Sequence, residues 1–187
     1  MNAKQDQVKK KKVQAKMLAL REKMWPGLAE EDLWDSAGKK GWVTIPRTLP
    51  LILRIIDELT PGKPAGRTFF GLWARDFGER MIEITNQAEL AVEAGHMGNR
   101  AVTGWRQKMR LLQDLGFIGA SDGPEEFHYV LIYNPFKVIK RLEPKISKSL
   151  FIMLLARAHD VGAKEMSDDE PSEESSAEED ASVKVPS

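Results

Sequence analysis

The sequence predicts a mainly α-helical protein with one small β-hairpin, and three observations support this fold class. Apolar side chains recur at helical spacing in several separate segments, which is typical of amphipathic helices. A turn sequence, Ser-Asp-Gly-Pro at 121–124, separates two short strand-like runs, as in a hairpin. The chain also begins with a lysine-rich segment and ends with an acidic, serine-rich one. We therefore expect a helical arm and a disordered acidic tail to flank the folded part.

Residues 1–40 are expected to form a basic helical arm followed by a linker. An exposed helix is predicted over 1–24, because a narrow apolar stripe recurs at spacings of four and three residues: Val13, Met17, Leu20 and Met24. The basic run Lys9–Lys12 lies upstream of this stripe. The arm could contact a DNA backbone, pair as a coiled-coil strand or simply remain solvated, and the sequence leaves these readings open.

The folded body is expected to span residues 41–142. Its first part should contain a strand or extended segment at 42–45, a helix at 46–59, a helix or a strand at 68–77, and a short strand at 81–84. Prolines and glycines between 61 and 66 should separate the 46–59 helix from the 68–77 segment. The apolar spacing predicts these inward-facing side chains: Leu49, Ile52, Leu53, Ile56, Leu59, Phe69, Leu72, Trp73 and Phe77.

Two helices joined by a short turn should follow the 81–84 strand. Thr85 or Asn86 can cap the first helix, with Glu89 as the reciprocal partner of a capping box. The sequence Gly-His-Met-Gly at 95–98 should end that helix and form the turn. The second helix is predicted over 99–114, and Gly116 is a good residue to end it.

The remaining elements alternate between extended and helical patterns. A hairpin is predicted between 117 and 133, and Asn134-Pro135 should end it. A short helix should follow at 136–142. Residues 143–164 should hold a strongly apolar helix at 146–158, which either packs on the body or forms a dimer seam. Residues 165–187 are expected to be disordered, because they are acidic and nearly free of large apolar side chains.

The 99–114 helix has two chemically different faces at about 100° per residue. One face is apolar and should lie in the core: Val102, Trp105, Met109 and Leu112. The other face carries hydrogen-bonding and basic side chains without one acid, and Arg100 lies at its edge: Asn99, Thr103, Arg106, Gln107 and Arg110. This division predicts a helix packed on one side and available to a partner on the other.

The exposed face matches the chemistry that reads base edges in the major groove. Arginine pairs with guanine there, and asparagine and glutamine pair with adenine. We therefore expect Arg106, Gln107 and Arg110 to face bases, and Arg100 and Thr103 to position the helix on the backbone. Asn99 could either read a base or cap the helix. A solvated helix surface is the alternative interpretation of the same residues.

The net charge of zero conceals an uneven distribution along the chain. The first 23 residues hold eight basic and two acidic side chains, whereas residues 165–187 hold nine acidic side chains and one lysine. Removing that tail leaves 27 basic and 19 acidic side chains, a net charge of +8. Such asymmetry favours an electrostatic partner, most simply nucleic acid, although solubility alone would explain either tail.

The sequence argues against catalysis, cofactor binding and membrane insertion. His96, His128 and His159 lack the spacing of a metal motif, and cysteine is absent. The Gly-Lys-Pro-Ala-Gly-Arg-Thr segment at 62–68 lacks the Gly-Lys-Ser/Thr ending of a phosphate loop. No run of 18 apolar residues and no signal-peptide pattern is present. We expect a non-enzymatic cytoplasmic protein with no cofactor, metal or small-molecule ligand, associated with the nucleoid if the source is bacterial.

The order of elements resembles a winged helix-turn-helix domain of the kind found in bacterial, plasmid and phage regulators and replication accessory proteins. The likeness covers roughly residues 45–142 and is carried by these segments: Ile84-Thr85, Glu89-Leu90-Ala91, Ala94-Gly95, Val102, Trp105, Met109-Arg110, Leu112, Leu115-Gly116-Phe117-Ile118 and Tyr129 to Pro135. It implies that the 99–114 helix enters the major groove and that the hairpin is the wing. The 67–83 segment is longer and more aromatic than a minimal domain of this type requires.

The resemblance implies double-stranded DNA binding by a transcription regulator or a replication or plasmid-maintenance accessory factor. The alternative is a non-catalytic winged-helix subunit that binds protein and touches DNA weakly or not at all. Glu125 and Glu126 favour that alternative, because a typical wing offers basic residues at this place. A homodimer through the 146–158 helix would place two recognition helices on two half-sites.

Overall fold

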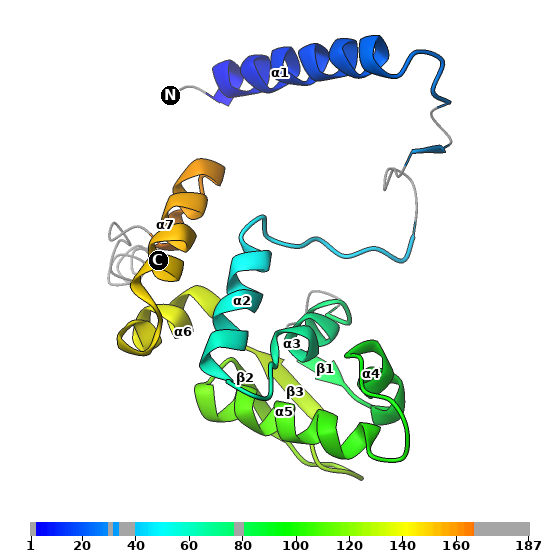
Figure 1. Cartoon of the computed structure of the whole chain (residues 1–187), viewed down its shortest axis with the longest axis vertical. Helices are drawn as coiled ribbons and strands as arrows, with labels where there is room; N and C mark the ends of the chain where they lie inside the picture. Colours follow the sequence, from blue (N-terminus) through cyan, green and yellow to red (C-terminus); the bar gives the residue numbers. More distant parts are fainter. Residues whose placement is uncertain (1–2, 30–31, 34–39, 77–80, 167–187) are drawn as a thin grey trace, which may run out of the picture. The chain divides into compact units, whose positions relative to one another are not determined.

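The computed structural model describes residues 3–29, 32–33, 40–76 and 81–166, which divide into two compact units between Trp42 and Val43. The first unit contains α1 (Ala3–Met24), and the second contains the other helices and a small sheet (Figure 1). The expected fold class, mainly α-helical with a small β component, is confirmed at this level. The predictions for Phe77 and for a disordered segment at 167–187 fall outside the described residues.

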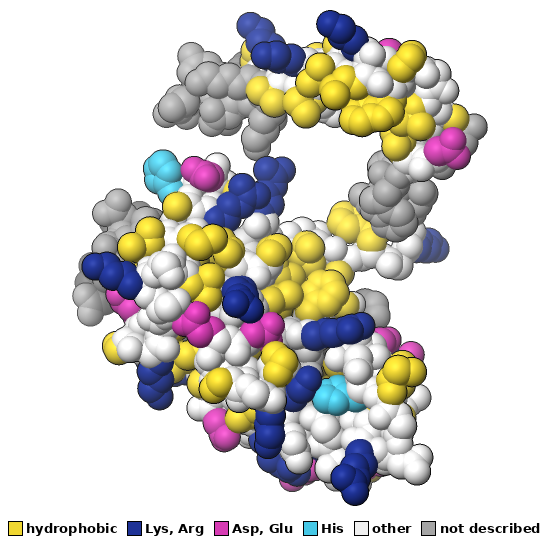
Figure 2. Space-filling view, viewed as in Figure 1, with side chains coloured by type: hydrophobic (Ala, Val, Ile, Leu, Met, Phe, Trp, Pro, Cys, Tyr) yellow, Lys and Arg dark blue, Asp and Glu magenta, His cyan; other side chains and the backbone are white. Residues whose placement is uncertain are grey.

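Helix α1 confirms the predicted N-terminal helix and exposes its apolar stripe. Met17, Leu20 and Met24 are each at least 45% exposed. The space-filling view shows apolar side chains following one another along this helix (Figure 2). In folded proteins most helical stability comes from the packing of an apolar face. Apolar and basic side chains therefore lie exposed together on α1.

The second unit begins with an extended segment and two packed helices. Residues 42–46 form no strand, contrary to one of the two expectations for this stretch. Helix α2 (Leu49–Leu59) starts three residues later than predicted, because Thr48 takes the capping position and Pro50 occupies the first turn. Helix α3 (Gly66–Trp73) ends earlier than predicted, and residues 74–75 form a turn.

The second unit also contains a three-stranded antiparallel sheet. The predicted hairpin is confirmed as β2 (Ile118–Ser121) and β3 (Tyr129–Ile132), with Ile118 opposite Ile132. The short strand β1 (Met81–Glu83) pairs with β3, so the strand order is β1-β3-β2. One face of the sheet is buried against the helices and the other is partly exposed, as expected for alternating strands.

Helices α4 (Gln87–Glu93) and α5 (Ala101–Leu115) follow β1 and are joined by a short turn. Asn86 caps α4 by accepting a hydrogen bond from the Glu89 backbone N–H at 3.2 Å, which confirms one of the two predicted caps. Gly95 ends α4 with a positive φ of 85°, and the His96 N–H donates back to the Ala91 carbonyl. The turn thereby changes the direction of the chain within a few residues and places α5 in contact with α4.

The C-terminal part packs on the same unit. Helix α6 (Pro135–Leu142) and the 3₁₀ turn Glu143–Lys145 lead into α7 (Lys148–Val161), which starts two residues later and ends three residues later than predicted. A second 3₁₀ turn, Lys164–Met166, follows, and Met166 is buried. Residues 165 and 166 therefore belong to the folded unit, contrary to the expectation of a disordered tail from 165 onward.

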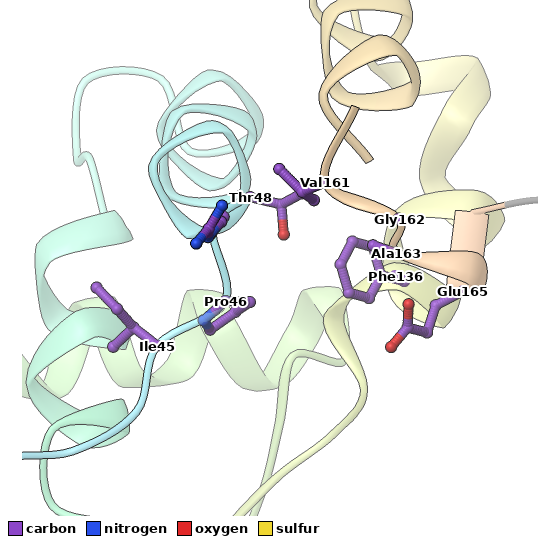
Figure 3. A pocket seen from close by; sticks show the side chains of 9 residues that line it. Ile45, Pro46, Thr48, Phe136, Val161, Gly162, Ala163 and Glu165 are labelled. Atoms are coloured by element: carbon purple, nitrogen blue, oxygen red, sulfur yellow. The ribbon is translucent and has the colours of Figure 1, made fainter. Parts of the chain in front are cut away.

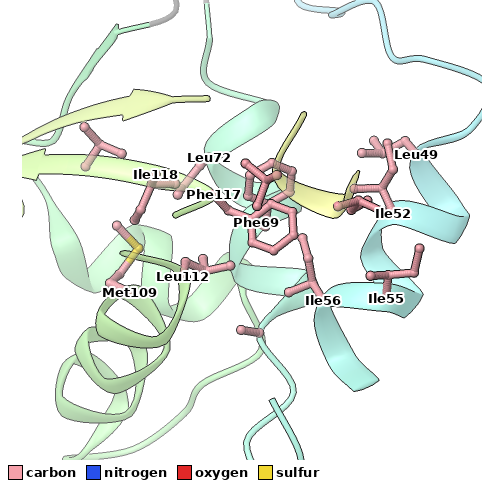
Figure 4. Close-up of a cluster of buried hydrophobic side chains, with 14 of the residues drawn as sticks. Leu49, Ile52, Ile55, Ile56, Phe69, Leu72, Met109, Leu112, Phe117 and Ile118 are labelled. Carbon is pink, nitrogen blue, oxygen red and sulfur yellow. The ribbon is translucent and has the colours of Figure 1, made fainter. Parts of the chain in front are cut away.

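The core of the second unit contains side chains from its helices and from its sheet. Phe69 of α3 and Phe117 before β2 meet edge to face, with ring centroids 5.7 Å apart. The close-up shows these two rings between the α2 side chains and those of α5 and β2 (Figure 4). The fully buried large side chains of this core are Leu49, Ile52, Ile55, Ile56, Phe69, Leu72, Trp105, Met109, Leu112, Phe117, Ile118 and Ile139. This core fixes α5 with one defined face outward.

Candidate nucleic-acid interface

Helix α5 is divided into a buried and an exposed face, as its sequence predicted, although Val102, which was expected in the core, is only partly buried. Trp105, Met109 and Leu112 are fully buried, and Trp105 packs edge to face on Phe127 at a centroid distance of 6.2 Å. Thr103 and Gln107 are exposed on the other side. Arg106 and Arg110 lie on that side too, with 31% and 52% of their side-chain areas exposed. Core packing therefore determines which side chains a partner can reach.

Asn99 and Arg100 lie before α5, although the sequence placed them within it. The helix starts only at Ala101, because Gly98 adopts a left-handed conformation and the residues after it complete the turn. Arg100 occupies the capping position without a side-chain cap bond, so Asn99 does not cap the helix. Both side chains are exposed at the N-terminal end of α5.

Arg110 forms a two-point ion pair with the hairpin loop. Its Nε donates to Glu126 Oε1 at 2.9 Å, and its Nη2 donates to Glu126 Oε2 at 2.7 Å. Paired bonds of this kind fix the plane of the guanidinium as well as its position. The side chain that the sequence assigned to DNA is thus already oriented by a carboxylate of the same chain.

Arg106 joins three elements through a different arrangement. Its Nε donates to Gln87 Oε1 at 2.7 Å, and its Nη2 donates to Glu125 Oε2 at 2.9 Å. Gln87 is only 5% exposed, and its amide nitrogen donates in turn to the Glu126 backbone carbonyl. Arg106 therefore connects the first turn of α4 with the hairpin loop.

Sequence reasoning noticed the two acids of the hairpin but did not pair them with the arginines of α5. Glu125 and Glu126 follow Arg106 and Arg110 by 19 and 16 residues, and no local pattern relates residues at that separation. Gln87 was missed altogether. One feature of the sequence could have indicated these ion pairs: two arginines lie four residues apart on the helix, and two adjacent acids lie in the hairpin loop that follows it.

The turn between α4 and α5 holds a histidine with a lowered pKa. The pKa of His96 lies below its ordinary value, first because the ring is partly removed from water and second because Lys108 is positive. Its Nε2 atom is buried without a hydrogen-bond partner in the described part of the chain. Both observations favour a neutral ring, so His96 adds no positive charge to this end of α5 at neutral pH.

Two pockets of the second unit lie away from α5, whereas a third includes Gln113 near the C-terminal end of that helix. A cavity of about 490 Å³ lies beside the N-terminal end of α2, between Pro46, Phe136 and Val161 (Figure 3). Among the described residues that line it, only Arg47 and Glu165 are titratable. Within the described residues no group of His, Asp and Glu side chains could hold a metal ion. No described helix has the length and apolar character needed to cross a membrane.

Basic and acidic side chains are interspersed over the body. Figure 2 shows lysines and arginines next to aspartates and glutamates on the visible face of the second unit. Arg75 is one example, because it pairs with Glu93 at 2.6 Å and with Glu89 at 3.2 Å. These carboxylates raise the pKa of Arg75, first through the hydrogen bond to Glu93.

Comparison with known protein families, curated proteins and solved structures finds no match for the chain.

Proposed function

We propose that the chain binds double-stranded DNA through the exposed face of α5, and that residues 43–142 form a winged helix-turn-helix domain. In such a domain two helices joined by a short turn present the second helix to the major groove. Helices α4 and α5 and the β2–β3 hairpin follow one another in the corresponding order. The observation that carries the proposal is the division of α5 into a buried apolar face and an exposed face of hydrogen-bond donors.

The exposed side chains receive different roles in this proposal. Gln107 and Arg110 contact base edges, because their side chains offer the donors that adenine and guanine accept. Asn99, Arg100 and Thr103 contact the backbone near the N-terminal end of α5, where free N–H groups favour phosphate. Arg106 is assigned to the structural link with Gln87 and Glu125 instead of to bases. The biological role would be transcription regulation or replication or plasmid maintenance.

A salt series of duplex binding tests the proposal. The wild type is compared with Arg100→Ala/Arg110→Ala and with Arg54→Ala/Arg157→Ala, a control that removes two exposed arginines from α2 and α7. We expect the first pair to weaken binding strongly and to make its salt dependence shallower, by about one unit of slope for each phosphate that is no longer neutralised. The control should bind like the wild type. Circular dichroism establishes that all variants are folded.

Equal binding by the two double variants would place the DNA contact elsewhere, most simply on α1. No duplex binding by the wild type would favour the second candidate function, a protein-interaction subunit. One observation supports that candidate: Glu125 and Glu126 already bind the guanidinium groups of Arg106 and Arg110. The exposed Ile152 and Met153 on α7 would then be a natural contact surface.

A further inference from the structure

The backbone that carries the Glu126 side chain is held in place by the fold on both sides. The Glu126 backbone carbonyl accepts a hydrogen bond from the buried amide of Gln87. The next residue, Phe127, is buried with its ring against Trp105. Its backbone has a φ of 61°, a left-handed conformation that side chains other than glycine rarely adopt. The Asp122 carboxylate holds this conformation by accepting from the Phe127 N–H at 3.2 Å.

The bond pattern of Arg110 leaves its outer edge available. Glu126 takes the Nε proton and one Nη2 proton. The second Nη2 proton and both Nη1 protons have no partner among the described residues, and about half of the side chain is exposed. Two terminal guanidinium nitrogens are the donors that arginine offers to guanine O6 and N7. Pairing with Glu126 therefore does not consume the edge that recognition needs.

We propose that Glu126 is a positioning residue that aims Arg110 at a guanine in the major groove. This inference rests on the proposed function, because it names one base that α5 reads and the group that orients the reader. A free arginine side chain loses rotamer freedom when it binds, and an arginine already fixed in its plane loses less. This smaller entropic cost strengthens binding only where a guanine meets the oriented edge of Arg110. The Arg110–Glu126 pair therefore increases discrimination between bases.

The same carboxylate opposes general attraction to DNA. It neutralises one arginine near the phosphates, and phosphate attraction makes up nearly all of nonspecific binding. Removing the charge should therefore have two opposite effects: tighter binding to arbitrary duplex and weaker discrimination at one guanine. A loop that merely blocked α5 would give only the first effect. The neighbouring Arg106 also bonds through Nε and Nη2, but its two partners lie in two different elements and its side chain is less exposed, so it is less suited to contact a base.

The test begins with a randomised duplex pool from which full-length wild-type protein selects a site. Dissociation constants are then measured for the selected duplex and for duplexes in which each guanine is changed to adenine. The proteins are the wild type, Arg110→Ala, Glu126→Gln, Glu126→Asp and Asp114→Asn. Asp114 is exposed on α5, so Asp114→Asn removes the same charge without taking a partner from Arg110. Thermal melting by circular dichroism verifies folding of each variant.

We expect at least one guanine at which the wild type discriminates by about tenfold or more. Arg110→Ala and Glu126→Gln should both lose discrimination at that same position, while Glu126→Gln binds arbitrary duplex as tightly as the wild type or more tightly. Glu126→Asp should keep the larger part of the discrimination, and Asp114→Asn all of it.

Glu126→Gln with unchanged discrimination, as in Asp114→Asn, would overturn the positioning role while leaving DNA binding by α5 intact. A selected site without a guanine that depends on Arg110 would have the same meaning. Failure of the wild type to bind any duplex would overturn the proposed function together with this inference.

Discussion

Trp105 connects the candidate interface to the core at the scale of a single residue. Its side chain is fully buried and packs on Phe127, the residue that follows Glu126. Trp105→Ala should lower the free energy of unfolding by about 3–5 kcal/mol, because it removes a large buried ring and leaves a cavity. Urea denaturation measures this, and Trp25→Ala, at an exposed position, should leave the midpoint unchanged. Equal midpoints for both variants would contradict the described core.

The two arginines of α5 should differ in their contribution to stability. Arg106→Ala leaves the buried Gln87 Oε1 without its donor and should cost about 1–3 kcal/mol of unfolding free energy. Arg110→Ala breaks a more exposed ion pair and should cost about 0–1 kcal/mol. Urea denaturation of the two variants side by side makes the comparison. Arg110→Ala proving the more destabilising would argue against Arg106 as the structural link.

At this scale the sequence predicted the faces of α5 but not the partners of its arginines. The helical period alone placed Trp105, Met109 and Leu112 inward, since it depends only on spacing along the chain. The pairing of Arg110 with Glu126 depends on where the hairpin loop lies relative to α5. That position is set by Phe127 entering the core and by Gln87 binding the loop, both of which are tertiary contacts.

The close approach of α2 and α3 requires a glycine at the scale of elements. A Cβ atom on Gly66 would lie 2.6 Å from the Leu53 carbonyl oxygen, whereas one on Gly71 of the same helix would meet nothing within 4 Å. Gly66→Ala should therefore destabilise by about 1–3 kcal/mol. Gly71→Ala should stabilise by about 0.5–1 kcal/mol, because alanine favours a helix. Thermal melting of both variants tests this, and shifts of the same sign would contradict the packing.

Helix α7 is attached to α2 through a carboxylate whose effect depends on pH. The pKa of Glu58 is lowered, first by the Ser147 backbone N–H at 2.6 Å and then by the Ser147 hydroxyl at 2.9 Å. A lowered carboxyl pKa stabilises the fold above the ordinary value of 4.5 and loses that effect as pH falls through the lowered value.

Glu58→Gln should therefore melt below the wild type at neutral pH. The difference should disappear once the pH is well below the ordinary carboxyl value, since the wild-type carboxylate is then protonated too. Asp160→Asn, at an exposed position of α7, serves as the control and should not differ from the wild type at neutral pH. A Glu58→Gln difference that persists into acid would rule out this ionisation as its source.

The sequence located most elements but misjudged several of their ends. The starts of α2 and α5 were placed too early, because proline and glycine near a helix start are compatible with both turn and helix. The pairing of β1 with β3 could not be predicted from local pattern, since more than 40 residues separate the two strands. The alternation in the hairpin was predictable because its two strands share one turn.

At the scale of the whole molecule, the chain combines a basic helical unit with a packed body. Helix α7 uses Leu150, Leu154 and Ala158 to pack within its own chain, which leaves Ile152 and Met153 as its exposed apolar pair. A homodimer through residues 146–158 stays a prediction, and it would have to form on that remaining face. DNA binding would draw on the positive charge of residues 1–164, to which the lysines of α1 contribute most densely.

Site-directed cross-linking to duplex DNA tests the central claim most directly. The chain has no cysteine, so Gln107→Cys on α5 and Met153→Cys on α7 each introduce a single exposed thiol for a photoreactive label. If α5 enters the major groove, the label at 107 cross-links to duplex DNA and the label at 153 does not. Cross-linking from 153 but not from 107, with both proteins folded, would contradict the account.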